Sequence, residues 1–158
     1  AIFHKDLTNH TMTVERTFNA PRARVWEAWT KSDLLDQWWA PKPWKAITKS
    51  FDFRAGGHWQ YAMQGPDGTK VWCWISYESI DAENSFTALD SFCEEDGTLT
   101  QEMPSTHWKN EFHADGETTK VLVTLTYKSN EDMEKIISMG FEAGFSMGLG
   151  NLDELLQA

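Results

Sequence analysis

His58 and the charged residues near it are the side chains in this sequence that are best suited to chemistry. His58 follows Gly56-Gly57, where an imidazole could donate to a ligand or act as a general base. Asp52 and Arg54 share one face of the strand expected before those glycines. They could anchor a carboxylated ligand, although we favour an ion pair that fixes the turn. Strand alternation places His58 on the face opposite Trp59, so exposure to solvent is its simpler interpretation.

The other reactive residues form no catalytic pattern. No nucleophile stands beside a base, and the serines lack the sharp turn that exposes a catalytic hydroxyl. Cys73 lies in an apolar strand and is expected to be an inert core residue. With Cys93 it makes neither a disulfide framework nor a metal pattern, and the histidines lack a metal-ligand spacing. We therefore predict no catalytic residue, no metal and no cofactor, and we favour a protein that is not an enzyme.

Large aromatic residues are unusually frequent, with nine tryptophans and nine phenylalanines. Each can bury on the order of 150–250 Å², so together they could fill a tryptophan-rich core or line a pocket. Trp38-Trp39 precede Ala40-Pro41, and one of the two could cover the mouth of a cavity.

The C-terminal segment has apolar residues at helical spacing, and the residues from 130 to 157 are predicted to form one long helix. Gly140, Gly144 and Gly148 lie four residues apart within its apolar stripe. A glycine inside a helix costs about 1 kcal/mol relative to alanine. We expect this cost to be offset either by close approach of the helix to a sheet or by room for a ligand.

Strands and short helices must position these residues. Alternation of apolar and polar residues predicts strands at 12–19, 47–54, 58–63, 70–80, 86–92, 106–113 and 120–127. Pro21 is suited to the first turn of a short helix, and a second short helix is expected at 30–38.

Asp-Gly pairs at Asp67-Gly68, Asp96-Gly97 and Asp115-Gly116 lie between the expected strands, and this dipeptide is a strong hairpin signal. Successive hairpins make an antiparallel meander with one covered face. Only the C-terminal helix is long enough to cover it. The sequence thus predicts an α+β domain, residues 12–158, with a curved sheet that grips one helix, preceded by a loosely ordered arm, residues 1–11.

The charge and composition exclude some classes of function. A net charge of −10 argues against nucleic acid and anionic membrane surfaces as partners. No apolar run has the length of a membrane-spanning helix, and residues 1–12 do not resemble a secretory signal. The cysteine usage fits a reducing cytoplasm. We expect a cytoplasmic protein.

Several motifs together resemble the family of activator of heat-shock protein 90 ATPase homologues, within the START-like, helix-grip (SRPBCC, Bet v 1-like) superfamily. They are RTFNAPRARVWEAWT at 16–30, LLDQWWAP at 34–41, FDFRAGGHWQYAMQGPDG at 51–68, YESIDAENSF at 77–86 and GFEAGFSMGLGNLDELL at 140–156. The resemblance implies a seven-stranded antiparallel sheet around the last helix, with a hydrophobic cavity between them. Relatives in this superfamily bind lipids, hormones or polyketides.

Our leading hypothesis is a binding protein for a hydrophobic, aromatic or lipid-like small molecule. The expected cavity lining is Trp39, Trp59, Tyr61, Trp72, Trp74, Phe141, Gly144, Phe145 and Gly148. A chaperone-activator-like interaction domain and a cyclase or aromatase acting on a polyketide-like substrate are the alternatives. A homodimer and a chaperone partner are left open.

Overall fold

Alternating apolar and polar residues build most of the molecule into one antiparallel sheet. The computed structural model describes residues 2–100 and 103–157, and in this part the chain forms eight strands and four helices. The strands are β1 (Ile2–Asp6), β2 (Thr11–Phe18), β3 (Lys45–Asp52), β4 (His58–Gln64), β5 (Lys70–Asp81), β6 (Ser85–Phe92), β7 (Thr106–Asp115) and β8 (Thr118–Thr126). The helices are α1 (Arg22–Thr30), α2 (Ser32–Trp38), α3 (Asn130–Ser138) and α4 (Phe141–Gln157).

The sheet has the strand order β1-β2-β8-β7-β6-β5-β4-β3. The run from β3 to β8 is a meander in which each strand pairs with the next, which confirms the prediction from the Asp-Gly pairs. Gly68 and Gly116 occupy the left-handed region, with φ of +88° and +63°, where a glycine has no Cβ penalty. β2 then closes on β8, so the first and last long strands are neighbours.

The N-terminal segment is a strand, and the expected loosely ordered arm is wrong for its described residues. β1 pairs with β2, with Phe3 opposite Val14. The side chain of Phe3 is half-buried against the core, which gives the strand an apolar anchor. This strand also accounts for the difference between the eight strands observed and the seven predicted.

The predicted long C-terminal helix is divided into α3 and α4. Gly140 separates them with φ +89°, and its N–H donates to the carbonyl of Ile137 at 3.0 Å. A glycine with positive φ after the last turn is a common helix ending. Gly140 therefore ends α3 and is not inside a helix, whereas Gly144 and Gly148 lie within α4 as predicted.

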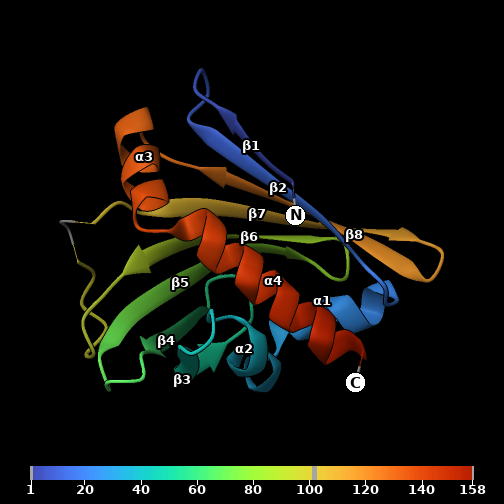
Figure 1. The fold of residues 1–158 in the computed structure, drawn as a ribbon, viewed down its shortest axis with the longest axis horizontal. Coiled ribbons are helices and arrows are strands. Elements are labelled where there is room, and N and C mark those ends of the chain that lie inside the picture. The colour runs from blue at the N-terminus through green and yellow to red at the C-terminus, as the bar shows by residue number, and fades with distance from the viewer. Residues whose placement is uncertain (1, 101–102, 158) are drawn as a thin grey trace.

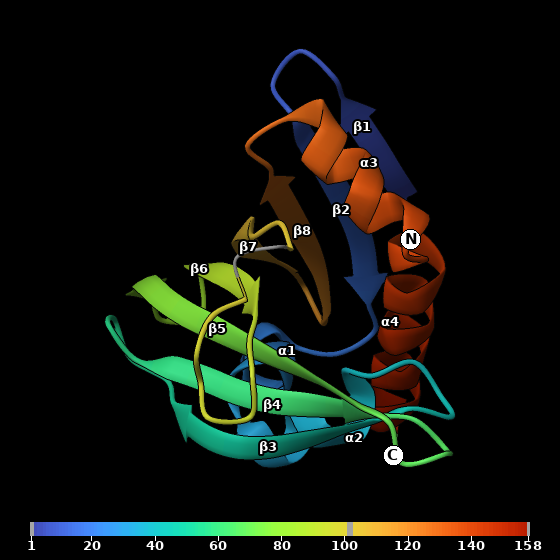
Figure 2. The same ribbon diagram turned by 90° about the vertical axis from the view of Figure 1, so that its left-hand side faces the viewer.

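The sheet bends around its helices. Figure 2 shows the curvature, and Figure 1 shows α4 crossing the concave side, with α1 and α2 near its C-terminal end and α3 near its N-terminal end. The core lies between this inner face and α1, α2 and α4, and Trp38, Trp59, Phe112, Leu125 and Leu152 are fully buried there. No helix in residues 2–100 and 103–157 is long and apolar enough to cross a membrane.

Candidate functional site

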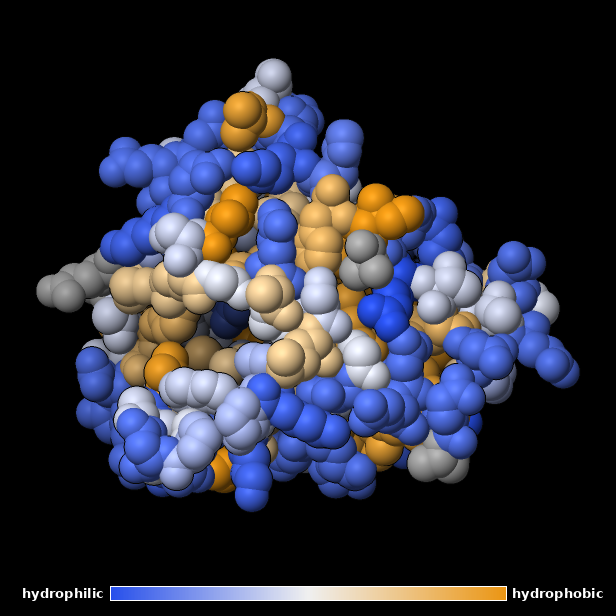
Figure 3. Space-filling view, viewed as in Figure 1, coloured by the Kyte–Doolittle hydropathy of each residue, from blue (hydrophilic) through white to orange (hydrophobic). Residues whose placement is uncertain are grey.

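A cavity of about 400 Å³ lies between the inner face of the sheet and the corner where α3 meets α4. Small-molecule sites typically have volumes of about 300–1,000 Å³, so this space is large enough for a ligand. Figure 3 shows it as a hollow rimmed mainly by apolar residues, with a hydrophilic surface visible inside. The sheet contributes lining residues from β4, β5, β6 and β7, and α3 contributes Ile136.

The first two turns of α4 form one wall of the cavity. Phe141, Gly144 and Phe145 line it, as the sequence predicted. A Cβ at Gly144 would lie 3.7 Å from Cγ of Pro41, which is ordinary van der Waals contact, and Pro41 also lines the cavity. The glycine thus widens the cavity by lacking a side chain, and no backbone presses against it.

Gly148, one turn further along α4, is outside the cavity, and its predicted place in the lining is wrong. A Cβ there would lie 3.1 Å from the carbonyl oxygen of Trp39 and 3.3 Å from that of Trp38. The glycine therefore allows close approach to the end of α2. One of the two explanations predicted for the glycines was that they let the helix pack closely against backbone, but this backbone was expected to belong to the sheet rather than to α2.

The tryptophan pair at the end of α2 separates into two roles. Trp38 is buried in the core, where its Nε1 donates to the carbonyl of Ala28 at 2.8 Å. Trp39 lines the cavity, and its Nε1 donates to the hydroxyl of Tyr61 at 2.9 Å. Tyr61 also lines the cavity, so this bond joins α2 to β4 across the cavity wall and holds both rings in place.

Trp59 lies behind this wall. It lines a second, much smaller space of about 20 Å³, and Trp39 and Trp108 line both spaces and separate them. Nε1 of Trp59 donates to Oγ1 of Thr48 at 3.0 Å, and that hydroxyl donates to Asp36 on α2 at 2.6 Å. Trp59 is thus a core residue that fixes α2 against β3 and β4, and the prediction that it lines the main cavity is wrong.

Trp72 and Trp74 are on the outer face of the sheet, and their predicted places in the cavity lining are wrong. The register pairs Tyr61 with Cys73, so Cys73 shares the inner face and its neighbours point outward. The ring of Trp72 lies 5.6 Å from Nζ of Lys49, and Trp74 stacks on His58 with ring centroids 4.3 Å apart.

His58 is therefore also on the outer face. Its Nε2 lies 2.7 Å from Oγ of Ser50. The ion pair favoured for the neighbouring charges is present, with Nε of Arg54 2.7 Å from Oδ2 of Asp52. None of these residues lines the cavity.

Asp90 is a cavity residue that the sequence reasoning missed. It lies on β6, opposite Ile75 of β5 and Thr106 of β7, and it lines the cavity together with Thr106. Burial raises the pKa of its carboxyl to about 7, and the Trp108 side chain acts in the opposite direction. The signal was available in the sequence, because alternation places Asp90 on the same face as Phe86 and Ala88.

The other titratable groups around Asp90 are neutral at neutral pH. Burial raises the pKa of the Tyr61 hydroxyl well above its ordinary value, and burial likewise raises the pKa of the Cys73 thiol. The described lining residues therefore include one group that titrates near pH 7, and they hold no acid–base pair at that pH. No group of three or more metal-ligating side chains occurs in the described ranges.

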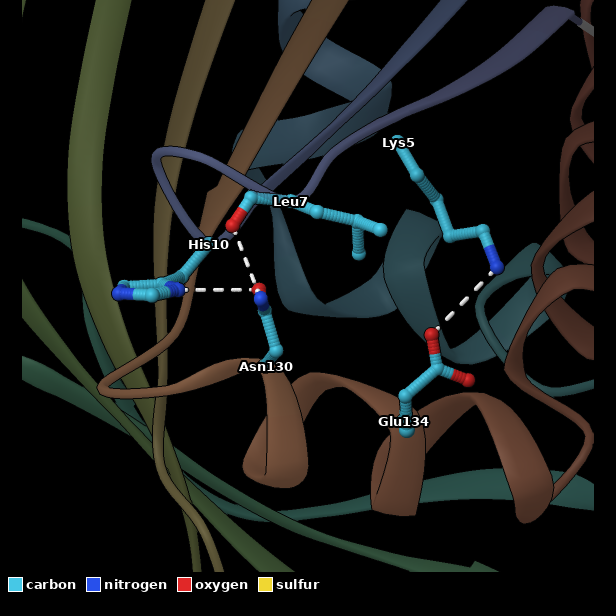
Figure 4. Close-up of polar contacts among 5 residues, drawn as sticks. All are labelled: Lys5, Leu7, His10, Asn130 and Glu134. Atoms are coloured by element: carbon cyan, nitrogen blue, oxygen red, sulfur yellow. Dashed lines mark hydrogen bonds and ion pairs between the residues drawn. The ribbon is translucent and has the colours of Figure 1, made fainter.

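A set of polar contacts holds α3 beside the cavity (Figure 4). Nδ1 of His10 lies 2.9 Å from Oδ1 of Asn130, and Nδ2 of Asn130 donates to the carbonyl of Leu7 at 2.9 Å. Nζ of Lys5 lies 3.5 Å from Oε1 of Glu134. The turn between β1 and β2 therefore fixes the position of α3, and strand β1 contributes to the site without touching the cavity.

Comparison with known proteins agrees with this geometry. The sequence matches the family model described as Activator of Hsp90 ATPase homolog 1-like protein over residues 19–157. The solved structure of a protein from Arthrobacter aurescens is 30% identical, with a TM-score of 0.93, and the match covers 99% of this chain and 91% of that one. Among curated proteins, no match is found.

Two further solved structures are similar. A protein from Mycobacterium smegmatis is 29% identical with a TM-score of 0.91, over 99% of this chain and 96% of that one. A protein from Staphylococcus epidermidis is 29% identical with a TM-score of 0.87, over 99% of this chain and 94% of that one. These likenesses confirm the helix-grip fold.

Proposed function

The chain belongs to the family of Activator of Hsp90 ATPase homolog 1-like proteins, and from this premise we propose that it binds a hydrophobic small molecule. The ligand lies in the cavity between the sheet and the first turns of α4. START-like helix-grip folds commonly bind hydrophobic ligands, and this supports the proposal at the level of the fold.

The observation that carries the proposal is the cavity itself. A space of about 400 Å³ lined by aromatic and aliphatic side chains is retained beside a well-packed core. Protein interiors are normally close-packed, and an empty space forfeits the contacts of the atoms that line it. A ligand that fills the space restores those contacts and removes apolar surface from water.

The rings of the cavity wall favour a flat apolar ligand. Trp39 and Trp108 have ring centroids 5.6 Å apart, and Phe145 lies 5.5 Å from Trp108. Aromatic rings in this range pack by offset or edge-to-face contacts. A fused aromatic ligand could extend this packing into the cavity.

The other hypotheses have less support. An enzyme of the cyclase or aromatase type needs an acid–base pair in the cavity, and the described lining residues hold only Asp90 as a group that titrates near neutral pH. A chaperone partner and a homodimer stay predictions. Cys73 and Cys93 are buried and unpaired with each other, which supports a proposal that the protein works in the reducing cytoplasm.

Binding of 1-ethylnaphthalene, a neutral apolar probe, tests the proposal. We expect saturable binding to the wild-type protein, measured by quenching of tryptophan fluorescence. Gly144→Leu places a branched side chain at the cavity wall, where it takes up space needed by the ligand, and should weaken binding at least tenfold. Trp72→Leu removes an aromatic ring from the outer face and should leave the affinity unchanged. No binding to the wild type, or equal binding by the Gly144→Leu protein, would contradict the proposal.

Native mass spectrometry of the freshly purified protein addresses the natural ligand. The expected result is an additional mass that is lost on denaturation and is absent from the Gly144→Leu protein. An additional mass of the same abundance in both proteins would place the bound molecule elsewhere.

A further inference from the structure

We propose that the ligand carries a basic nitrogen, and that its cationic group pairs with the carboxylate of Asp90 while its apolar body fills the cavity. This inference rests on the proposed function, because it names the chemical class of the molecule that the same cavity binds.

The position of Asp90 is the first observation. Its partners across the sheet are Ile75 and Thr106, and β6 directs its side chain to the inner face and the cavity. Among the described residues that line the cavity, Asp90 is the only charged one, and no lysine, arginine or histidine lines it. A carboxylate that is removed from water without a cation is costly. The protein itself offers no lining cation to offset this cost.

The groups around Asp90 confirm that it stands alone as a charge. Burial and, to a lesser extent, the negative charge of Asp90 raise the pKa of five nearby side chains, all of them hydroxyls or thiols that are neutral at neutral pH. They come from β4, β5 and the segments after β6 and β8, and they are Tyr61, Cys73, Tyr77, Cys93 and Tyr127. The helices contribute only uncharged residues to the lining, such as Ile136, Phe141 and Phe145.

Nearby rings are the second observation. The side chains of Trp39 and Trp108 line the same cavity as Asp90, and their ring centroids lie 5.6 Å apart. A cation is attracted to the face of a tryptophan ring as well as to a carboxylate. An amine next to Asp90 would therefore gain from both kinds of group, whereas an anionic ligand would be repelled by the carboxylate.

The overall charge acts in the same direction. A net charge of −10 raises the local concentration of cations around the protein and disfavours anions. This long-range effect is not specific, so the test must separate it from pairing with Asp90.

Three probes that share the same naphthalene ring but differ in their side group provide that test. They are 1-naphthylmethylamine, 1-naphthylmethanol and 1-ethylnaphthalene, and their affinities are measured by tryptophan quenching on the full chain. At pH 8, where Asp90 is ionised and the amine is charged, the amine should bind at least tenfold more tightly than the hydrocarbon. In Asp90→Asn this ratio should fall to about one. Asp115→Asn removes the same charge from an exposed position of β7 and should keep the ratio.

The pH dependence of the wild-type protein gives a second readout that needs no variant. Because burial raises the pKa of Asp90 to about 7, its carboxyl is mostly protonated at pH 5.5. The preference for the amine over the hydrocarbon should therefore be lost at pH 5.5 and recovered at pH 8.

The outcomes distinguish this inference from the proposed function. If the hydrocarbon binds and the amine has no advantage, or if the alcohol binds most tightly, the inference fails and the proposed function stands. If the advantage persists in Asp90→Asn, or is lost equally in Asp115→Asn, pairing with Asp90 is contradicted. If no probe binds, both the inference and the proposed function fail.

Discussion

The two halves of α4 face different surroundings, although both belong to one helix. The first half, residues 141–147, lines the cavity through Phe141, Gly144 and Phe145, and in the described part of the chain it makes ring contacts but no side-chain hydrogen bond to another element. Residues 148–157 are tied to the rest of the molecule by polar contacts. Asn151 donates to the carbonyls of Trp38 and Ala40, at 3.4 and 3.1 Å.

Further contacts fix the second half at its far end. Asp153 pairs with Arg16 of β2, and Arg24 of α1 donates to the carbonyl of Leu156 at 2.7 Å. Leu149 and Leu152 are fully buried. The second half of α4 therefore anchors the helix, whereas the first half lines the cavity and touches the sheet through ring contacts with Trp108.

This comparison explains the spacing of the glycines. Gly144 and Gly148 are one turn apart on the same face, but only Gly148 lies against backbone. The same residue type thus widens a cavity in one half and permits a tight contact in the other. The predictions that follow test this difference.

The largest expected difference is between Gly148→Leu and Gly144→Leu. A leucine at 148 would collide with the carbonyls of Trp38 and Trp39, which cannot move without displacing α2, so we expect it to lower the free energy of unfolding by about 3 kcal/mol. A leucine at 144 points toward the cavity and Pro41 and should change it by less than about 1 kcal/mol. Urea denaturation measures both. Equal losses at the two positions would contradict the comparison.

Asp90→Asn tests the difference between the polar groups of the two regions. The cavity beside the first half of α4 holds a carboxyl without a cationic partner among the described lining residues, whereas Asn151 and Asp153 of the second half are hydrogen-bonded or ion-paired. In the folded state the pKa of Asp90 is raised to about 7, above its value of 3.8 in the unfolded chain. The contribution of Asp90 to stability is therefore fully present below the unfolded pKa and is lost as pH rises through 7. From pH 5 to pH 8 the wild type should therefore lose about 2 kcal/mol relative to Asp90→Asn.

Urea denaturation of the two proteins at several pH values gives that difference. Asp115→Asn, with its exposed carboxyl, should run parallel to the wild type. An Asp90→Asn protein that also runs parallel to the wild type would show that Asp90 does not titrate differently in the folded state.

Asn151→Ala tests the anchor of the second half. It removes the donor to two carbonyls at the end of α2, and we expect a loss of about 1.5 kcal/mol in the free energy of unfolding. Gln157→Ala, at an exposed position of the same helix, should be nearly neutral. Thermal unfolding followed by circular dichroism is sufficient. A neutral Asn151→Ala would mean that packing alone holds this half.

The smallest expected effect is a gain. Gly144→Ala adds a methyl group at ordinary contact distance from Pro41 and improves helix propensity, so it should stabilise the protein by about 0.5 kcal/mol. Gly148→Ala should instead destabilise it, because its Cβ would be 3.1 Å from the carbonyl oxygen of Trp39. A gain at both positions would remove the difference between the two halves.

Strand positions and the meander could be predicted from the sequence, because alternation and Asp-Gly pairs are local signals. The N-terminal strand β1 could not. Its five residues include His4, Lys5 and Asp6, and its stability comes from pairing with β2 and from the contacts of its turn with α3. Such long-range partners are not visible in a short polar segment.

The predicted lining agrees with the cavity at Trp39, Tyr61, Phe141, Gly144 and Phe145, and was wrong at Trp59, Trp72, Trp74 and Gly148. Trp72 and Trp74 were chosen because they are large, but in a strand the face is set by register, and a shift of one residue reverses it. Residue size does not carry that information. Asp90 was missed although its alternation with Ala88 placed it on the inner face, because the predicted lining was limited to apolar and aromatic residues.

The glycine series shows a similar limit. Helical spacing placed Gly140 inside one long helix, yet its positive φ ends α3 there. Only backbone conformation distinguishes a glycine that ends a helix from one that lies within it. The periodicity of the apolar residues continues across the break and hides it.

The most direct test of the central claim uses the indole N–H signals of the tryptophans in a nitrogen–proton correlation spectrum. Trp39 and Trp108 line the cavity, whereas Trp72 and Trp74 are on the outer face of the sheet. On titration with 1-ethylnaphthalene, the signals of Trp39 and Trp108 should shift and those of Trp72 and Trp74 should stay in place. Shifts confined to Trp72 and Trp74, or no shift at saturating probe, would contradict a ligand site beneath the first half of α4.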